Sequence, residues 1–286
     1  MSSVFHPAPE RLDRLSALLL AVAPRVTVHG AHAQGHTLCV QLLSLPGQAP
    51  HSIAVGPGPC GQGPSPSLES AQDGPPVSGP PVSMQVLLEG PAAPMLMREF
   101  DPPLVLPLAS ADPALRHAVQ LLCSELNAPR CGQPAMLASV GHMLFIGLLR
   151  HLVAHPLASG GLFAGLNDPR IAASLVAMHE EPQGAWTLES LAERAGMSRT
   201  AFATRFKDSV RTSPGKYLSQ LRLLIAQRAV QSGKSLKSAA RESGYLNASA
   251  LSRALAKARP HRAAPERTPV NAPARPRPGT STAGPG

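Results

Sequence analysis

Residues 187–206 read TLESLAERAGMSRTAFATRF, and this stretch decides the fold of the C-terminal part of the chain. Thr187 and Ser198 are good helix N-caps, and Gly196 between them suits a left-handed turn. Apolar residues at helical spacing give the two helices an inner face: Leu188, Leu191, Ala192, Ala195, Phe202 and Phe206. The pattern predicts a helix-turn-helix motif, in which the outer face of the second helix is free to enter a DNA major groove.

The same pattern returns at residues 236–255, LKSAARESGYLNASALSRAL. Gly244 supplies the turn and Asn247 the cap, and Leu251 lies on the inner face of the second helix. Between the motifs, the sequence predicts a long amphipathic helix over residues 214–231, about 27 Å in length at about 1.5 Å per residue. Two recognition helices held about 34 Å apart can enter consecutive major grooves. Two motifs with a rigid spacer therefore indicate DNA binding by a single chain.

Charge is distributed unevenly along the chain. Residues 1–184 carry 8 Arg, no Lys and 12 acidic side chains, for a net charge of −4. Residues 185–255 carry a net charge of +8, and residues 256–286 a net charge of +5. Such asymmetry favours a polyanion as partner of the C-terminal part, and double-stranded DNA is the usual one because binding releases its condensed counterions.

Residues 185–255 resemble the DNA-binding domain of the AraC/XylS family of transcription regulators. The resemblance rests on three stretches, LAERAGMSRTAFATRF, SPGKYLSQLRLLIAQRAV and LKSAARESGYLNASALSRAL. It implies a transcription regulator with DNA as partner, RNA polymerase as a further candidate partner, and no catalytic residue. The family usually closes its second motif with an aromatic residue, a glycine and an SPxxF/Y/W stretch. Here Leu255 is followed by AKARPHRAAPERTPV, so we expect the last helix to fray.

By motif position, the resemblance also implies which side chains face DNA. The first recognition helix would present Arg199, Thr200, Ala203 and Thr204, and the second Asn247, Ala248, Ser249, Ser252 and Arg253. The expected phosphate contacts are Arg199, Arg205, Lys207, Lys216, Lys237 and Arg253. Because most of the first set are small, we expect few bidentate base contacts, and selectivity that rests in part on DNA shape and phosphates.

Residues 1–160 more loosely resemble the cupin-like sensor domain that precedes a helical hairpin in one branch of the family. LSLPGQAPHSIAV carries this resemblance, and its His51 is the one residue we assign to a small-molecule effector. We predict one or two strands within residues 26–45, and further strands from Met84 and from Leu104. The Pro- and Gly-rich residues 56–81 cannot bury enough apolar surface to offset their chain entropy, so we expect a disordered insert.

Apolar spacing and capping predict the remaining helices. An N-terminal helix has one apolar side, formed by Leu12, Leu15, Leu19 and Val22. A hairpin pairs a helix capped by Asp112, ending near residue 127, with a second helix over about residues 134–151. The second helix carries a stripe that would pack in the core or line a homodimer interface: Met136, Val140, Met143, Leu144, Leu148 and Leu152. Asp168 caps a further helix over residues 169–180, and Trp186 would anchor that helix to the first motif.

The expected fold class is α+β. A small β-rich, partly cupin-like domain would span residues 1–160, with the insert at about 56–81 and the hairpin at about 112–155. A linker and helix would follow over 161–184, then an all-α domain with two helix-turn-helix motifs over 185–258. Residues 259–286 would form a disordered basic tail.

The cysteine content and the hydropathy of the sequence indicate the cellular compartment of the protein. Cys39, Cys60, Cys123 and Cys131 form no CxxC pair and are too sparse for a disulfide scaffold or a zinc ribbon, so a reducing, cytoplasmic compartment fits best. The longest apolar runs, LSALLLAVA and MLFIGLL, are far shorter than the roughly 20 residues that span a bilayer. We therefore expect no transmembrane helix and no membrane partner.

Two alternatives stay open. A cupin-type metal-binding enzyme would rely on His29, His32, His36 and His51, although no glutamate lies at cupin spacing beside them. A degraded regulator would bind DNA without sequence preference. His151 and His155 would face one way on a helix, but the glutamate of an HExxH motif is missing. The sequence therefore predicts no catalytic residue, no metal and no cofactor.

Overall fold

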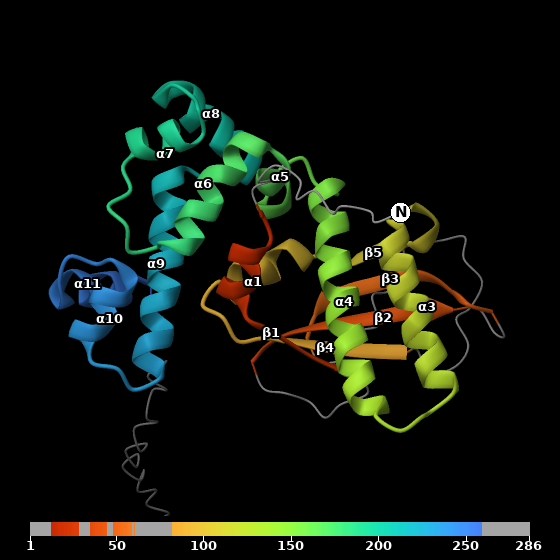
Figure 1. Ribbon diagram of the computed structural model, residues 1–286. Coiled ribbons are helices and arrows are strands. Elements are labelled where there is room, and N and C mark those ends of the chain that lie inside the picture. The colour runs from red at the N-terminus through yellow and green to blue at the C-terminus, as the bar shows by residue number, and fades with distance from the viewer. Residues whose placement is uncertain (1–12, 29–34, 45–47, 59, 61–81, 259–286) are drawn as a thin grey trace, which may run out of the picture.

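The computed structural model describes residues 13–28, 35–44, 48–58, 60 and 82–258, and its fold class is α+β, as predicted (Figure 1). An antiparallel sheet with a helical hairpin forms the N-terminal part, and helices form the C-terminal part. The predicted tail and most of the predicted insert lie outside the described residues, as do Leu12, His29 and His32.

The sheet has five antiparallel strands in the order β1-β4-β2-β3-β5. These are β1 (Pro24–Val28), β2 (His36–Ser44), β3 (Pro50–Pro57), β4 (Val82–Leu88) and β5 (Leu104–Pro107). The sequence predicts all of them except β3. Prolines are frequent in and around this strand and do not suggest one, and its end overlaps the start of the predicted insert. Pro50 and Pro57 stand at the two ends of β3, where a missing N–H is tolerated, and Ile53 and Val55 between them are buried.

The predicted helical hairpin is confirmed as α3 (Pro113–Asn127) and α4 (Gln133–Ala154), which pack side by side over the sheet (Figure 1). Gly141 lets α4 approach the strands closely, because a Cβ there would lie 2.6 Å from Cγ1 of Val26 and 3.1 Å from Sδ of Met84. The Asp112 side chain makes no capping hydrogen bond to α3, contrary to the prediction.

The apolar stripe predicted on α4 divides between the core and the surface, with Val140, Leu144, Leu148 and Leu152 buried. Met136 is 43% exposed and Met143 is 57% exposed. The buried face of α4 consists of Val140, Gly141, Leu144, Phe145, His151, Leu148, Leu149, Leu152 and Val153. The close approach at Gly141 turns this face toward the sheet and leaves both methionines outside.

By length and composition, α4 could also cross a bilayer, with a mean hydropathy of 1.5 over an 18-residue window. The sequence prediction considered only the shorter run MLFIGLL within it. Half of the window is buried inside the molecule, against α3 and β1. A core helix meets the same criterion, so this feature is weak support for a membrane span.

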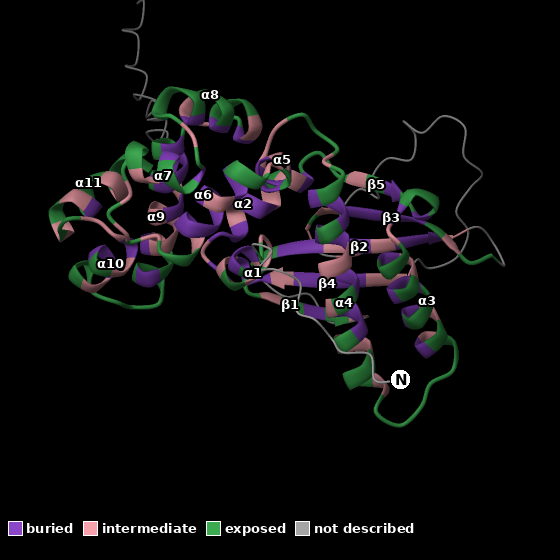
Figure 2. Ribbon diagram, turned by 45° about the horizontal axis from the view of Figure 1, so that its top comes forward, coloured by how far each residue is buried: buried purple, intermediate pink, exposed green. Residues whose placement is uncertain are grey.

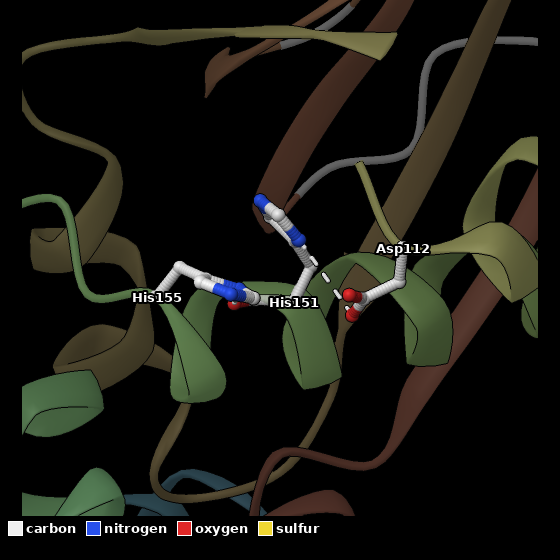
Figure 3. A group of neighbouring side chains, drawn as sticks. All are labelled: Asp112, His151 and His155. Atoms are coloured by element: carbon white, nitrogen blue, oxygen red, sulfur yellow. Dashed lines mark hydrogen bonds and ion pairs between the residues drawn. The ribbon is translucent and has the colours of Figure 1, made fainter. Parts of the chain in front are cut away.

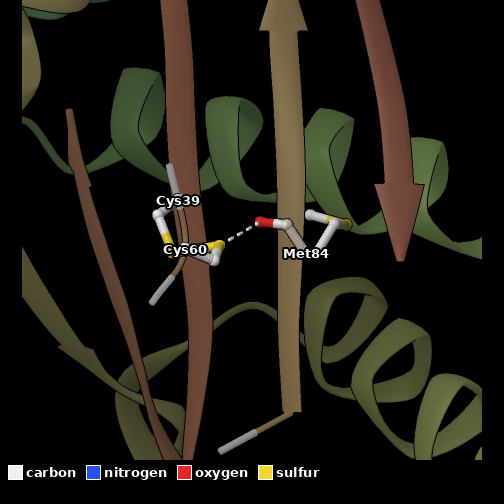
Figure 4. The surroundings of a disulfide bond; sticks show 3 residues. All are labelled: Cys39, Cys60 and Met84. Atoms are coloured by element: carbon white, nitrogen blue, oxygen red, sulfur yellow. Dashed lines mark hydrogen bonds between the residues drawn. A yellow bond between two sulfur atoms is a disulfide. The ribbon is translucent and has the colours of Figure 1, made fainter. Parts of the chain in front are cut away.

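A disulfide joins Cys39 on β2 to Cys60, just beyond β3, which the sequence did not predict (Figure 4). Cys39 lies opposite Gly56 in the β2–β3 ladder, so the hairpin brings residue 60 next to it. The Sγ atom of Cys60 also lies 3.4 Å from the carbonyl oxygen of Met84 on β4. Sequence spacing could not reveal this pair, because strand pairing creates it. Cys123 and Cys131 are free.

Short helices connect the sheet to the C-terminal part. They are α1 (Ser16–Val22), α2 (Ala93–Met97), η2 (Arg98–Phe100), η3 (Leu108–Ser110) and α5 (Leu162–Asn167). In α1 the predicted apolar side faces the core, because Val22 is buried and Leu15 and Leu19 pack half-buried against the large cluster; Ala17 and Leu18 are buried as well. The helix α5 occupies part of the predicted linker and buries Phe163.

The predicted helix α6 (Pro169–Glu180) is confirmed, and the Asp168 carboxylate accepts hydrogen bonds from the backbone N–H groups of Arg170 and Ile171. The remaining helices are α7 (Leu188–Arg194), α8 (Arg199–Val210), α9 (Pro214–Gln231), α10 (Leu236–Ser243) and α11 (Ala248–Ala258). One buried cluster runs from the sheet through α5 and α6 to α8 and the first half of α9 (Figure 2). A second, much smaller cluster joins the end of α9 to α10 and α11.

Candidate nucleic-acid interface

The first helix-turn-helix motif forms as its sequence predicts. Thr187 and Ser190 exchange hydrogen bonds in a capping box at the start of α7. Gly196 has a φ of +60°, a conformation that favours glycine, and it turns the chain from α7 into α8. The Ser198 hydroxyl then accepts a hydrogen bond from the backbone N–H of Ala201. These contacts fix the angle at which α8 leaves the turn.

Aromatic residues anchor α8 from beneath. Phe202 and Phe206 are fully buried with their ring centroids 5.6 Å apart, and the ring of Tyr217 on α9 lies 5.8 Å from that of Phe206. The Tyr217 hydroxyl and Nε2 of His179 on α6 are joined by a hydrogen bond of 2.7 Å. Burial lowers the pKa of His179 to about 4 and raises that of Tyr217, so both side chains are neutral at pH 7. The helix α8 is thereby fixed to α6 and α9.

The second motif repeats this geometry with smaller side chains. Ser235 caps α10, and Gly244 turns the chain with a φ of +74°. The Asn247 side-chain oxygen accepts a hydrogen bond of 2.8 Å from the backbone N–H of Ala250 and so caps α11. Leu251 is fully buried, and α11 continues past Leu255 to Ala258. The expected fraying at Leu255 is therefore not present in the described part of the chain.

The helix α9 has the predicted bounds, and the two motifs lie at its two ends (Figure 1). A second connection runs through the segment 182–184, which leads into α7. Arg222 on α9 donates hydrogen bonds of 2.7 Å to the carbonyl oxygens of Pro182 and Gly184. A Cβ at Gly244 would lie 2.7 Å from Cα of Gln183, so this turn touches the same segment. The motifs are thus held by a helix and by a bridge beside it.

The side chains assigned to DNA by motif position lie on the outer surface of the two motifs, except Lys216, which lies in the first turn of α9 and lines a hollow with Arg98 and Glu99. Ala203 and Ala248 are half-buried, and the others are exposed. The exposed ones are Arg199, Thr200, Thr204, Arg205, Lys207, Lys216, Lys237, Asn247, Ser249, Ser252 and Arg253. The Asn247 oxygen is occupied by the α11 cap, which leaves its NH₂ group as the part available to a ligand.

Two of the assigned arginines form ion pairs within the protein. Arg199 donates to Glu189 at 2.5 Å, and this hydrogen bond lowers the pKa of Glu189. Arg205 is paired with Asp168, the residue that caps α6. Partial burial acts to raise the pKa of Asp168, but the hydrogen bond and charge of Arg205 lower it overall. For the described residues, no ion pair is found for the other four assigned cations, Lys207, Lys216, Lys237 and Arg253.

An open concave surface lies in front of each recognition helix. The first is lined by Met197, Ser198, Thr200, Ala201, Thr204, Arg205 and Asp208. The second includes Lys237, Arg241, Asn247, Ala248 and Ser249. Sequence reasoning missed Arg241, although it follows Lys237 by four residues and therefore shares a face of α10 with it.

The histidines proposed for a cupin metal site do not converge in the described part of the chain. His51 lies on β3 beside the pairs Leu43–Ser52 and Ser44–Pro50, whereas His36 begins β2. Seven residues along a strand separate the two positions by about 23 Å, at about 3.3 Å per residue. Both side chains are exposed. A metal site shared by His36 and His51 is therefore wrong.

Two family models match different parts of the chain. Residues 191–259 match a helix-turn-helix domain, and residues 39–154 match a cupin. A putative AraC-like transcription regulator of Streptomyces lividans is 39% identical over 112 residues, which are 38% of this chain and 37% of that protein. An uncharacterized HTH-type transcriptional regulator of Haemophilus influenzae is 33% identical over 135 residues, 47% of this chain and 45% of that protein.

The crystal structure of ToxT from Vibrio cholerae aligns with 81% of this chain and 91% of that chain, at a TM-score of 0.35 and 9% identity. The chain spans less than half the length of the curated relatives it matches. Their names describe bacterial helix-turn-helix regulators and do not favour the cupin-enzyme alternative. The helix-turn-helix match begins within α7 and covers the rest of both C-terminal motifs, and the cupin match covers the hairpin and the sheet from Cys39 onward. The chain is therefore similar to AraC-like transcription regulators, with a cupin-like N-terminal domain before the helix-turn-helix domain.

Proposed function

We propose that this protein is a sequence-specific transcription regulator that binds double-stranded DNA with α8 and α11 in consecutive major grooves. One observation carries the proposal: two capped helix-turn-helix motifs are held together by α9 and by the bridge at residues 182–184. Their outer surfaces belong to a region of net charge +8. A fixed spacing lets one chain contact two grooves without first ordering a linker.

The proposed contacts divide by chemistry. Lys207, Lys216, Lys237 and Arg253 have no ion pair in the described structure and would reach phosphates directly. Arg199 and Arg205 would exchange Glu189 and Asp168 for phosphate oxygens on binding. The small assigned side chains would read groove shape and base edges: Thr200, Ala203, Thr204, Asn247, Ala248, Ser249 and Ser252. Arg241 joins the phosphate contacts because it lines the same concave surface as Lys237.

We assign the remaining parts of the chain to the domains of such a regulator. We propose residues 185–258 as the DNA-binding domain, residues 1–160 as the sensor and dimerisation domain, and 161–184 as the connection. Leu121 on α3 and Met136 and Met143 on α4 are exposed apolar side chains of the hairpin, which supports a homodimer formed through it. We further propose that a small-molecule effector binds near His51 and that the protein contacts RNA polymerase. The proposed location is cytoplasmic, and we propose no enzymatic activity.

The test is duplex binding by the full chain to a pool of fragments from its own genome, at several salt concentrations. We expect enrichment of particular sequences. Seven phosphate contacts, the six predicted ones and Arg241, predict a slope of log K against log[salt] of about −6. The variant Arg199→Ala with Arg253→Ala should lose the enrichment and flatten the slope by about 2.

A charge-matched control separates specific contacts from net charge. Arg25 on β1 and Arg150 on α4 are exposed in the N-terminal part, so Arg25→Ala with Arg150→Ala removes the same charge away from both recognition helices. This control should keep the enrichment. Steep salt dependence without enrichment in the unaltered protein would contradict the proposal and support the degraded regulator, which binds by charge alone.

A further inference from the structure

Three potential metal ligands meet at the open end of the α3–α4 hairpin, outside the DNA-binding surface (Figure 3). Asp112 precedes α3, while His151 and His155 lie one turn apart at the end of α4. One ligand atom from each residue lies within 4.8 Å of the others. The i, i+4 spacing places both imidazoles on one side of α4, and Figure 3 shows Asp112 beside them.

The His151 ring has an unusual environment for a histidine of the core. Its side chain is only 4% exposed, and Nδ1 has no hydrogen-bond partner in the described structure. The closest charged atom is Oδ2 of Asp112, 3.6 Å away, which is too far for a normal hydrogen bond. Buried polar atoms are usually satisfied. An ion bound by both Nδ1 of His151 and the Asp112 carboxylate would explain why Nδ1 lacks a hydrogen-bond partner.

Asp112 supports the same conclusion from the opposite side. It occupies the N-cap position of α3, where an aspartate normally accepts hydrogen bonds from backbone N–H groups, yet it makes none. Its carboxylate lies toward His151 instead (Figure 3). His155 is exposed, and its Nδ1 lies 3.3 Å from the carbonyl oxygen of His151. A rotation of this exposed ring would bring its nitrogen closer to the other two ligands.

We propose that Asp112, His151 and His155 bind a divalent transition-metal ion, with Zn²⁺ as the favoured ion. Two imidazole nitrogens and one carboxylate oxygen are a common ligand set for zinc. Bonds of about 2.0–2.1 Å in a tetrahedral site place ligand atoms about 3.4 Å apart, close to the separation of Nδ1 and Oδ2 here. Three protein ligands leave a fourth position for water on the exposed side of His155.

The position of this site gives the metal a structural role. The chain itself joins α3 to α4 at the other end, through residues 128–132. A metal at Asp112 would close the open end, at the point where the chain leaves α4 toward α5. The helix α5 packs against α8, so this end of the hairpin leads directly to the first helix-turn-helix motif. The sequence did not predict the site because its third ligand lies 39 residues before His151.

Metal titration of the tag-free full chain tests the proposal, with Zn²⁺ followed by calorimetry and Co²⁺ by its visible absorption. We expect one ion per chain, bound with a dissociation constant below about 10 µM. Asp112→Ala and His155→Ala should each weaken binding by about tenfold or more and remove the tetrahedral Co²⁺ bands. Both side chains can be removed without emptying a core position, so the variants should fold, which circular dichroism checks.

The matched control is His142→Ala, because His142 lies on the same helix but bonds to the carbonyl oxygen of Ala138. This variant should bind zinc as the unaltered protein does. Absence of saturable binding would overturn the proposal. Binding that stays equally tight in Asp112→Ala and His155→Ala would also overturn it, since the ion would then be held elsewhere.

Discussion

The two helix-turn-helix motifs share a sequence pattern but differ in how they are held. The first buries Phe202 and Phe206 in the large cluster that continues into the sheet and hairpin. The second is packed on a cluster of four alanines and Leu251 at the end of α9. The same turn geometry is thus supported by aromatic rings in one motif and by small side chains in the other. A matching pattern therefore does not imply matching stability.

Polar and backbone contacts compensate in part in the second motif. Lys234 pairs with Glu242, and the turn at Gly244 rests on the segment beside Arg222. An exposed ion pair contributes little to stability, typically less than about 1 kcal/mol. We therefore expect the second motif to open locally before the rest of the protein unfolds. The first motif should unfold only with the large core.

The largest effect should follow from Phe202→Ala in the first motif. Loss of a fully buried phenyl ring leaves a cavity and should lower the free energy of unfolding by about 3–5 kcal/mol. Because Phe202 belongs to the large cluster, chemical denaturation should show one transition at lower denaturant for the whole protein. Thr204→Ala on the exposed side of α8 is the control and should change stability by less than about 0.5 kcal/mol. A separate early transition for α7 and α8 alone would show that the first motif is independent of the core.

Leu251→Ala tests the second motif, and its effect should be large but local. Removing the one large side chain of the small cluster should cost about 2–3 kcal/mol within α10 and α11. Hydrogen exchange should speed up in these two helices and stay unchanged in α6 and α8. Ser252→Ala, on the neighbouring exposed position, should leave exchange as it is. Equal acceleration in α8 would contradict two separately held motifs.

Acid should destabilise the large core, which includes the first motif, because His179 is buried in it. The pKa of His179 is lowered to about 4 by burial, whereas an unfolded histidine titrates near its ordinary value of 6.5. The unfolded chain therefore gains the proton first as pH falls, and stability is lost between about pH 6.5 and pH 4. At pH 5 the loss should be about 2 kcal/mol relative to pH 7.5. Denaturation at a series of pH values measures it.

The control for this pH dependence is His179→Gln, which removes the titrating ring and keeps a polar group near Tyr217. The variant is expected to be less stable at pH 7.5 but to lose less on acidification. An unchanged slope between pH 6.5 and pH 4 would mean that another group causes it.

The smallest effect concerns the two recognition-helix caps. Asn247→Ala and Ser198→Ala each remove a cap, at a cost of about 1 kcal/mol. The Asn247 bond is 2.8 Å and the Ser198 bond is 3.4 Å, so the loss should be greater at Asn247. Amide exchange at the first turns of α8 and α11 compares them. A greater loss at Ser198 would contradict the geometric ranking.

The parts of the fold that the sequence predicts are those set by local chemistry. The bounds of α6 and α9 follow from Asp168, from Pro214 and from helical apolar spacing. Contacts between distant segments could not be predicted. Three features depend on which strand or helix packs alongside: the strand β3, the Cys39–Cys60 disulfide and the close approach of α4 to the sheet at Gly141.

In the candidate site, too, the sequence predicts the local features but not the contacts between distant residues. Helical position alone places the assigned side chains of α8 and α11 on the outer surface. Their partners could not be read from sequence, because Asp168 reaches Arg205 from 37 residues away and Glu189 reaches Arg199 across the turn. The bridge that holds the motifs together depends on Arg222, which sequence reasoning treated as one helix residue among others.

Hydroxyl-radical footprinting of the full chain on an enriched fragment shows whether both motifs bind one DNA duplex in consecutive major grooves. We expect two protected windows centred about 10 base pairs apart, with Arg199→Ala weakening one and Arg253→Ala weakening the other. A single protected window, or loss of the same window in both variants, would contradict binding by both motifs.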